Sequence, residues 1–355
     1  MRRWLGQAEG TEGTPRTEGT ATCPLEPVTF FRPIKSGECG IEGGLRLFLE
    51  AIKPGDRVLF GASGERERAL CAGLAAEFPG LDIQCPPLAD VPALNPKVAK
   101  LIQMERFAEP GRWVVLDSDA RADRKFLSAF RAEWEASGAA AFSAPYVFDG
   151  AGGFFSRLDA VSTELSLWPG VALLRATGRL DFLAGACMAV RGPDLLALGG
   201  WKILADVLAD DHELGAAIAR AGGAVGISRA AVTLAAPYDI ARDWALHQHR
   251  TFATFRVCNP AGSLGMPLAF GLAASFLLLL AHPRSPSRWL LHAGVLAARV
   301  SAARSLPGAK KDLCATWMSG LLEPIFWGLG WLPLPVRWAG RWITPKKLRP
   351  ISRNH

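Results

Sequence analysis

Two pairs of aspartates carry the clearest chemical signal in this sequence. Residues 114–116 are apolar and run directly into Asp117 and Asp119, which are two positions apart. Alternate residues at the end of a strand face the same side, and ligands of open α/β folds bind at the carboxyl edge of the sheet. Two carboxylates there can hold a divalent cation against a diphosphate, although acidic residues at strand ends also cap helices or bind loop amides.

The second pair, Asp210 and Asp211, stands at the start of a predicted helix. Asp211 is the best candidate for a general base, while the alternative is that one of the pair only caps the helix. Sugar transfer from a nucleotide needs a cation on the leaving diphosphate and a carboxylate that deprotonates the acceptor hydroxyl. The two pairs therefore favour an enzyme that uses a sugar nucleotide.

The elements around these residues alternate in type. Apolar runs typical of strands cover 28–34, 57–61, 81–85, 113–116, 141–148, 182–191 and 225–234. Helical spacing of apolar residues covers 41–52, 65–78, 97–106, 126–136, 158–174, 193–198 and 210–221. This alternation predicts an α/β fold with a twisted, mostly parallel sheet and helices on both faces.

The carboxyl-terminal third is more apolar than the rest. Residues 257–283 contain no Asp, Glu, Lys or Arg. Since roughly 20 apolar residues cross a bilayer core, we predict a transmembrane helix there. Residues 289–298 are too short to span by themselves, and 313–336 are interrupted by prolines, so this segment is re-entrant, interfacial or kinked.

The net charge is +7, and basic residues gather beside the apolar segments, as at Lys310, Lys311, Arg337 and Arg341. This clustering predicts a cytoplasmic face against an anionic bilayer. No aromatic and basic stripe or zinc-ligand spacing accompanies it, which argues against a nucleic-acid partner. The seven cysteines form no C-x-x-C pair and are odd in number, as expected for reduced thiols in the cytoplasm.

Several short motifs follow one another in a fixed order. They are Arg32-Pro33-Ile34-Lys35, Asn95-Pro96-Lys97-Val98, Asp117-Ser118-Asp119, Gly185-Ala186-Cys187-Met188-Ala189, Leu208-Ala209-Asp210-Asp211 and His247-Gln248-His249-Arg250-Thr251. The ordered set resembles the ceramide glucosyltransferase group, with its bacterial hopanoid-associated relatives, among the processive-type inverting glycosyltransferases of GT-A fold. The similarity runs from about residue 28 to 345.

The resemblance implies a role for each matching residue. Asp119, assisted by Asp117, would coordinate Mn²⁺ or Mg²⁺ under the diphosphate, and Asp211 would be the base. Arg250 would contact the diphosphate or close the acceptor side. Lys97 and Lys35 would face the donor. The implied enzyme is a membrane-bound hexosyltransferase that moves glucose or an N-acetylhexosamine from a UDP-sugar to the hydroxyl of a ceramide- or hopanoid-like lipid.

Composition, hydropathy and the resemblance together predict an organisation along the chain. Residues 1–24 form a disordered segment without an apolar run, 25–255 the GT-A domain, 256–345 a membrane-associated helical region and 346–355 a basic tail. The amino-terminal transmembrane helix common in the family has no counterpart in this sequence, either because the protein lacks it or because the gene model is shortened. The protein is expected at the inner membrane, in contact with the lipid bilayer, with its catalytic domain facing the cytoplasm.

The chain departs from the family pattern at two places. The first acidic motif falls on 63–67, where only Glu65 or Glu67 can replace the aspartate that meets the nucleotide. On the acceptor side, His247 and Thr251 replace Gln or Arg and Trp, and His247 is expected to hydrogen-bond rather than to bind metal. Two alternatives therefore stay open: a polysaccharide synthase-like glycosyltransferase and a degenerate, non-catalytic membrane-associated relative.

Overall fold

The computed structural model describes residues 26–35, 40–89, 91, 93–149, 152–235, 238–305, 313–338 and 340–344. The expectations for residues 1–24 and 346–355 lie outside these ranges.

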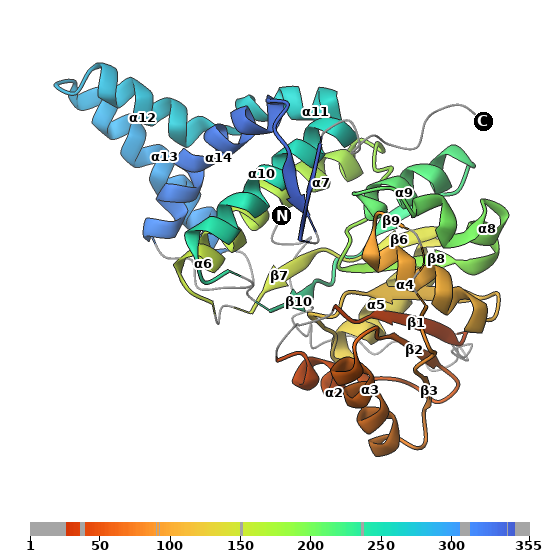
Figure 1. Cartoon of the computed structure of the whole chain (residues 1–355). Helices are drawn as coiled ribbons and strands as arrows, with labels where there is room; N and C mark the ends of the chain where they lie inside the picture. Colours follow the sequence, from red (N-terminus) through yellow and green to blue (C-terminus); the bar gives the residue numbers. More distant parts are fainter. Residues whose placement is uncertain are drawn as a thin grey trace, which may run out of the picture.

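The largest sheet of the described chain has seven strands and lies on the right in Figure 1. Its strands, in spatial order, are β3 (Asp82–Gln84), β2 (Arg57–Gly61), β1 (Val28–Pro33), β4 (Arg112–Leu116), β8 (Cys187–Arg191), β6 (Ala141–Ser143) and β9 (Val225–Ile227). Only β8 runs antiparallel to its neighbours in this sheet. The predicted mostly parallel sheet is therefore confirmed.

Helices cover both faces of this sheet because its strands are apolar on both sides. They are α2 (Glu42–Leu49), α3 (Glu65–Glu77), α4 (Pro96–Met104), α5 (Arg124–Ser137), α8 (Gly192–Ala197) and α9 (Asp210–Arg220). Phe30 and Val114 face α2 and α5, whereas Phe31 and Val115, one residue further along each strand, face α4, α8 and α9. Such alternation with nearly continuous apolar strands is what a buried parallel sheet requires.

Two expected strands each divide between two sheets. Residues 141–148 form β6 and then β7 (Tyr146–Phe148), and residues 225–234 form β9 and then β10 (Val232–Leu234). β7 and β10 join β5 (Ala120–Arg121) in a second, three-stranded sheet. Pro145 separates β6 from β7, because proline has no amide hydrogen for the ladder. A third expected strand, 182–191, is shorter than predicted and begins only at Cys187.

The expected helix over 158–174 is longer than predicted and has an irregular middle. It consists of α6 (Phe154–Ser162), a π-helical turn (Thr163–Leu167) and α7 (Trp168–Ala176). Pro169 lacks the amide hydrogen that a regular helix would donate to the carbonyl of Leu165, which accounts for the wider turn.

The prediction of one continuous helix over 257–283 is wrong. Helix α10 (Ala241–Cys258) ends at the start of this range. It is followed by α11 (Pro260–Gly265), a 3₁₀ turn (Met266–Ala269) and α12 (Gly271–Ala281). Pro260 and Pro267 interrupt the helical ladder, and the Asn259 side chain caps α11 by accepting from the Gly262 amide at 2.8 Å. Within the described ranges no single helix has both the length and the apolar composition of a membrane span. The segments Pro260–Ala269 and Gly271–Ala281, which meet at 49°, have that length and composition only when the two are taken together.

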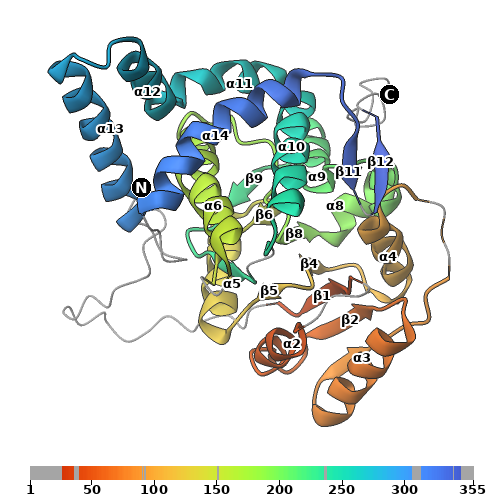
Figure 2. The same cartoon turned by 60° about the vertical axis from the view of Figure 1, so that its left-hand side comes forward.

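The remaining helices are α13 (Pro286–Arg304) and α14 (Leu313–Trp331), followed by a hairpin of β11 (Val336–Trp338) and β12 (Arg341–Ile343). Helix α14 crosses both α6 and α10, which lie side by side (Figure 2). Their interface buries Leu158, Trp244, Phe252 and Phe326 in a common apolar cluster. This packing holds α10, and with it residues 247–251, against α6.

Candidate active site

The loop after β4 is held by a buried arginine. Arg32, near the end of β1, donates from its guanidinium to the carbonyl of Ala120 at 3.2 Å and lies 4.9 Å from the ring centre of Phe48. The amide of Asp117 donates to the carbonyl of Ala186 at 3.0 Å. The loop that carries Asp117 and Asp119 is therefore fixed from both ends.

Lys97 connects its own motif with three others. Asn95 caps α4 by accepting from the amides of Lys97 and Val98, so that Lys97 lies in the first helical turn. Its ammonium lies 2.7 Å from an oxygen of Asp117 and 3.3 Å from an oxygen of Asp210, and it donates to the carbonyl of Gly185 at 3.1 Å. Burial lowers the pKa of Lys97, but the carboxylates of Asp117 and Asp210 outweigh it, and the pKa lies above its ordinary value.

Neither Asp210 nor Asp211 caps α9. The cap position is Ala209, without a side-chain hydrogen bond, while Asp210 accepts from the side-chain amide of Asn95 at 3.2 Å. Asp211 accepts from the amide of His212 at 2.8 Å. The interpretation of these residues as helix caps is therefore wrong, and both side chains belong to the cluster at the sheet edge.

Asp211 lies directly against Gly185. A methyl group at Gly185 would stand 2.9 Å from an oxygen of the Asp211 carboxylate. Burial, assisted by the neighbouring charge of Asp210, raises the pKa of Asp211 to about 6, although Lys97 acts in the opposite direction. A carboxylate with a pKa near the working pH is suited to accept and release a proton.

Helix α10 contributes a second group of side chains. Arg250 donates to Nδ1 of His247 at 2.9 Å, and Nε2 of His247 lies 3.6 Å from an oxygen of Asp159. Thr251 is also close, with its hydroxyl 3.5 Å from Nε2 of the same ring. Burial and the charge of Arg250 lower the pKa of His247 to about 3, so that the ring is neutral. His247 thus takes part in hydrogen bonds, as expected from its polar surroundings.

Two tyrosines connect the two groups. Burial raises the pKa of Tyr146, and the charges of Asp159, Asp211, Asp117 and Asp119 raise it further. Burial and the charge of Asp159 also raise the pKa of Tyr238, Arg250 opposes this shift, and Asp119 adds to it. The charges of Asp119 and Asp211 act on Tyr146, and those of Asp119 and Arg250 act on Tyr238, so Asp119 is common to both groups of side chains.

Sequence reasoning missed Asp159, Tyr146 and Tyr238. The one available signal was that the chain contains only two tyrosines, and both lie here. Of the other predicted residues, Lys35 follows β1 and Glu65 begins α3 after β2. The parallel strands end in register, with Pro33 opposite Gly61, so both residues are exposed at the same edge of the sheet.

The acidic residues at this edge fit a cation that is shared with a substrate. Within the described part of the chain, no group of three His, Cys, Asp or Glu side chains is placed to hold a metal ion. Mg²⁺ commonly binds through one or two carboxylates and completes its shell with substrate phosphates and water. Asp117 and Asp119, both half-buried, provide such a pair.

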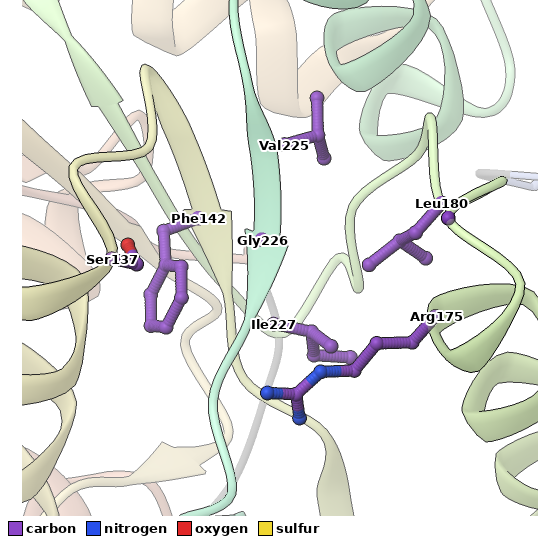
Figure 3. A pocket seen from close by; sticks show the side chains of 8 residues that line it. Ser137, Phe142, Arg175, Leu180, Val225, Gly226 and Ile227 are labelled. Carbon is purple, nitrogen blue, oxygen red and sulfur yellow. The ribbon is translucent and has the colours of Figure 1, made fainter.

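A pocket of about 180 Å³ lies elsewhere, beside the edge strand β9. Figure 3 shows that Phe142, Leu180 and Arg175 surround Ile227 there. None of the residues that line this pocket is acidic, and it shares no residue with the site described above.

Solved structures similar to this chain include the following three. A mannosyltransferase from Pyrobaculum calidifontis, solved with GDP-Man and Mn²⁺, is 20% identical over 91% of this chain and 92% of its own, with a TM-score of 0.52. Glucosyl-3-phosphoglycerate synthase from Mycobacterium tuberculosis, solved with Mn²⁺ and UDP-glucose, is 15% identical over 66% of this chain and 79% of its own, with a TM-score of 0.40. TarS from S. aureus, solved with UDP-GlcNAc, is 11% identical over 92% of this chain and 97% of its own, with a TM-score of 0.39.

No curated protein sequence matches the chain. The mannosyltransferase shares the arrangement of the sheet and its helices, which confirms the GT-A-type fold. The model of glycosyl transferase family 21 matches residues 4–344. The chain therefore belongs to glycosyl transferase family 21, the ceramide glucosyltransferase family that its motifs predicted, and it is a glycosyltransferase.

Proposed function

We propose that this protein is a membrane-bound, inverting hexosyltransferase that moves glucose or an N-acetylhexosamine from a UDP-sugar to a lipid hydroxyl, with a ceramide- or hopanoid-like acceptor. The observation that carries the proposal is the position of Asp211. Its half-buried carboxylate, with a raised pKa, lies beside the group formed by Lys97, Asp117 and Asp210. A base thus stands next to side chains suited to a diphosphate.

In the proposed reaction Asp211 removes the proton of the acceptor hydroxyl. The hydroxyl oxygen forms a bond to the anomeric carbon of the sugar, on the face opposite the diphosphate. The bond between that carbon and the diphosphate oxygen breaks, and its electron pair leaves with UDP. The anomeric configuration is inverted, and the proton stays on Asp211 until solvent removes it.

The donor side is assigned to the cluster around Lys97. Asp119 and Asp117 would hold Mn²⁺ or Mg²⁺, which when bound neutralises charge on the leaving diphosphate. Lys97 and Lys35 add positive charge near the donor, and Glu65 stands where the nucleotide is expected. The guanidinium of Arg250 can donate to two phosphate oxygens at once.

The acceptor side is assigned to α10. His247 and Thr251 lie there with Tyr146 and Tyr238 nearby. Threonine in place of the larger indole leaves more room beside Arg250. Hence we expect the choice of acceptor to differ from that of relatives with tryptophan at this position.

We assign residues 25–255 to catalysis and 256–345 to contact with the cytoplasmic leaflet of the inner membrane. Helices α12 and α13 form a hairpin that projects from the rest of the chain, at the upper left of Figure 1. Leu277 is 65% exposed and Leu290 74% exposed on this hairpin, and the exposed Arg284 lies at its tip. Exposed leucines with basic neighbours suit an interfacial position against anionic lipids.

The test is sugar transfer in membranes that contain the protein. Radiolabelled UDP-sugars are supplied one at a time with Mn²⁺ or Mg²⁺, and the lipids are extracted. We expect one labelled lipid, which disappears with Asp119→Ala but persists with the control Asp243→Ala, a change at an exposed aspartate of α10. A labelled polymer would favour the polysaccharide synthase-like alternative, and no product from any donor would favour the non-catalytic one.

A further inference from the structure

Asp159 is a buried carboxylate that belongs to none of the sequence motifs. It lies on α6, is 2% exposed and accepts from the side-chain amide of Gln248 at 2.6 Å. Its oxygen lies 3.6 Å from Nε2 of His247. Burying a carboxylate is costly unless neighbouring groups compensate for the lost water. The compensating groups here are on α10, which carries Arg250.

The hydrogen bond from Arg250 defines the tautomer of His247. Arg250 is always a donor, so the nitrogen that accepts from it, Nδ1, carries no hydrogen. The ring is neutral, and its one hydrogen is therefore on Nε2. Nε2 faces the carboxylate of Asp159, which favours a hydrogen at that position.

We propose that Asp159 is a positioning residue: through His247 it aims the guanidinium of Arg250 at the leaving diphosphate. Asp159 stabilises the tautomer in which His247 accepts from Arg250, and the bond limits the rotamers of a long side chain. The ring of Tyr238 lies 5.0 Å from the ring of His247, and the charge of Asp159 raises the pKa of both Tyr146 and Tyr238. The chain from Asp159 to Arg250 therefore borders the acceptor side of the site. The inference rests on the role proposed above for Arg250.

The first experiment is a double-mutant cycle with Asp159→Asn and Arg250→Lys, measured as kcat and KM for the UDP-sugar. Asp159→Asn keeps the size of the side chain and removes the carboxylate, and the rates are measured above pH 7, where Asp159 is ionised. A misplaced guanidinium should reduce kcat roughly tenfold to a hundredfold. In the Arg250→Lys background the same change should have less than about a twofold effect, since residues that act through one another are not additive.

The second experiment replaces His247, whose ring lies between Asp159 and Arg250. His247→Asn retains an acceptor near the position of Nδ1 and should keep most of the activity, whereas His247→Leu should lose as much as Asp159→Asn. This comparison stands even where Asp159→Asn fails to fold. The matched control is Glu323→Gln, which alters another buried carboxylate, on α14, and should leave kcat unchanged in the folded protein.

Three results would overturn the inference: wild-type kcat for Asp159→Asn, an equal loss in both Arg250 backgrounds, or equal activity of His247→Asn and His247→Leu. These differ from failure of the proposed function. If the wild-type protein transfers no sugar, the function itself is wrong. If Arg250→Lys retains full activity, the role of Arg250 is wrong and Asp159 has nothing to position.

Discussion

At the scale of single residues, the site depends on charges held close together with little water. Lys97 lies between Asp117 and Asp210, and this arrangement offsets the repulsion among the carboxylates. Asp211 does not contact the ammonium as closely, and its pKa remains raised. Neighbouring acids with different surroundings can thus have different tasks.

Replacing Asp211 by Asn should remove the base while the fold is kept. We expect kcat to fall by roughly a hundredfold to ten-thousandfold, the usual contribution of a positioned base. The KM for the UDP-sugar should change little, because Asp211 acts on the acceptor. Steady-state rates with the matched variant Asp243→Asn as control would check this, and a loss confined to KM would contradict it.

The raised pKa of Asp211 predicts a specific pH dependence. A base with a pKa of about 6 takes up its proton as the pH falls through 6, so kcat/KM should decline below that pH rather than near 4. Burial also raises the pKa of Asp159 to about 7. The profile should therefore be measured in Asp159→Asn as well; a limb that remains near pH 6 in that variant belongs to Asp211, and its absence there would contradict the assignment.

A substitution at Gly185 tests how closely the position of the Asp211 carboxylate must be kept. In Gly185→Ala the added methyl group would stand 2.9 Å from the Asp211 carboxylate and push it from its position. We expect activity to fall roughly a hundredfold. The control is Gly170→Ala, where no atom lies within 4 Å of the added carbon. Equal activity of both variants would show that Asp211 tolerates displacement.

At the scale of elements, the site is made of chain segments that begin or end at one edge of the sheet. β1 and β4 end there, and α4 and α9 begin there. Helix α10 supplies Arg250 although it follows the last strand of the main sheet. The apolar run of 257–283 does not continue α10, because prolines break it. Its second half forms α12, one of the two helices of the projecting hairpin.

The hairpin of α12 and α13 leads to a prediction about membranes. The wild-type protein should float with vesicles that contain anionic lipid, and Leu277→Glu with Leu290→Glu should shift it to the soluble fraction, since both leucines would enter the interface. Leu173→Glu is the matched control, because Leu173 on α7 is also 65% exposed. If all three proteins float equally, the hairpin does not bind the bilayer.

At the scale of the whole molecule, α14 connects the carboxyl-terminal helices to the site. Its Glu323 is buried, accepts from Ser166 at 2.8 Å and pairs with Arg299 of α13 at 2.9 Å. Arg299 also donates to the hydroxyl of Ser319 at 3.2 Å. This polar group ties the turn between α6 and α7 to α13 and α14.

Breaking this pair should destabilise the protein without altering the chemistry. Glu323→Gln leaves Arg299 uncompensated and should lower the free energy of unfolding by about 3 kcal/mol. Replacing both partners, with Arg299→Met and Glu323→Leu, should recover much of that loss, because no buried charge remains. Denaturant unfolding would measure both, and a double variant less stable than the single one would contradict the argument.

The sequence by itself determined the alternation of strands and helices, the two apolar faces of the sheet and the family. The residues alone pointed to Asp117 and Asp211, because these lie at the ends of elements whose order along the chain implies a common edge. Lys97 was indicated only by the resemblance to the family. The two divided strands and the broken helix were not recognised, although Pro145 and Pro260 mark the breaks.

Only the tertiary structure decided what surrounds those residues. Asp159 and Gln248 are 89 positions apart, and no local pattern relates them. Their contact depends on the packing of α14 across α6 and α10, which is set by apolar burial in three helices at once. Periodicity shows which face of a helix is buried but not which helix covers it, and so the partners of Arg250 become visible only in the folded chain.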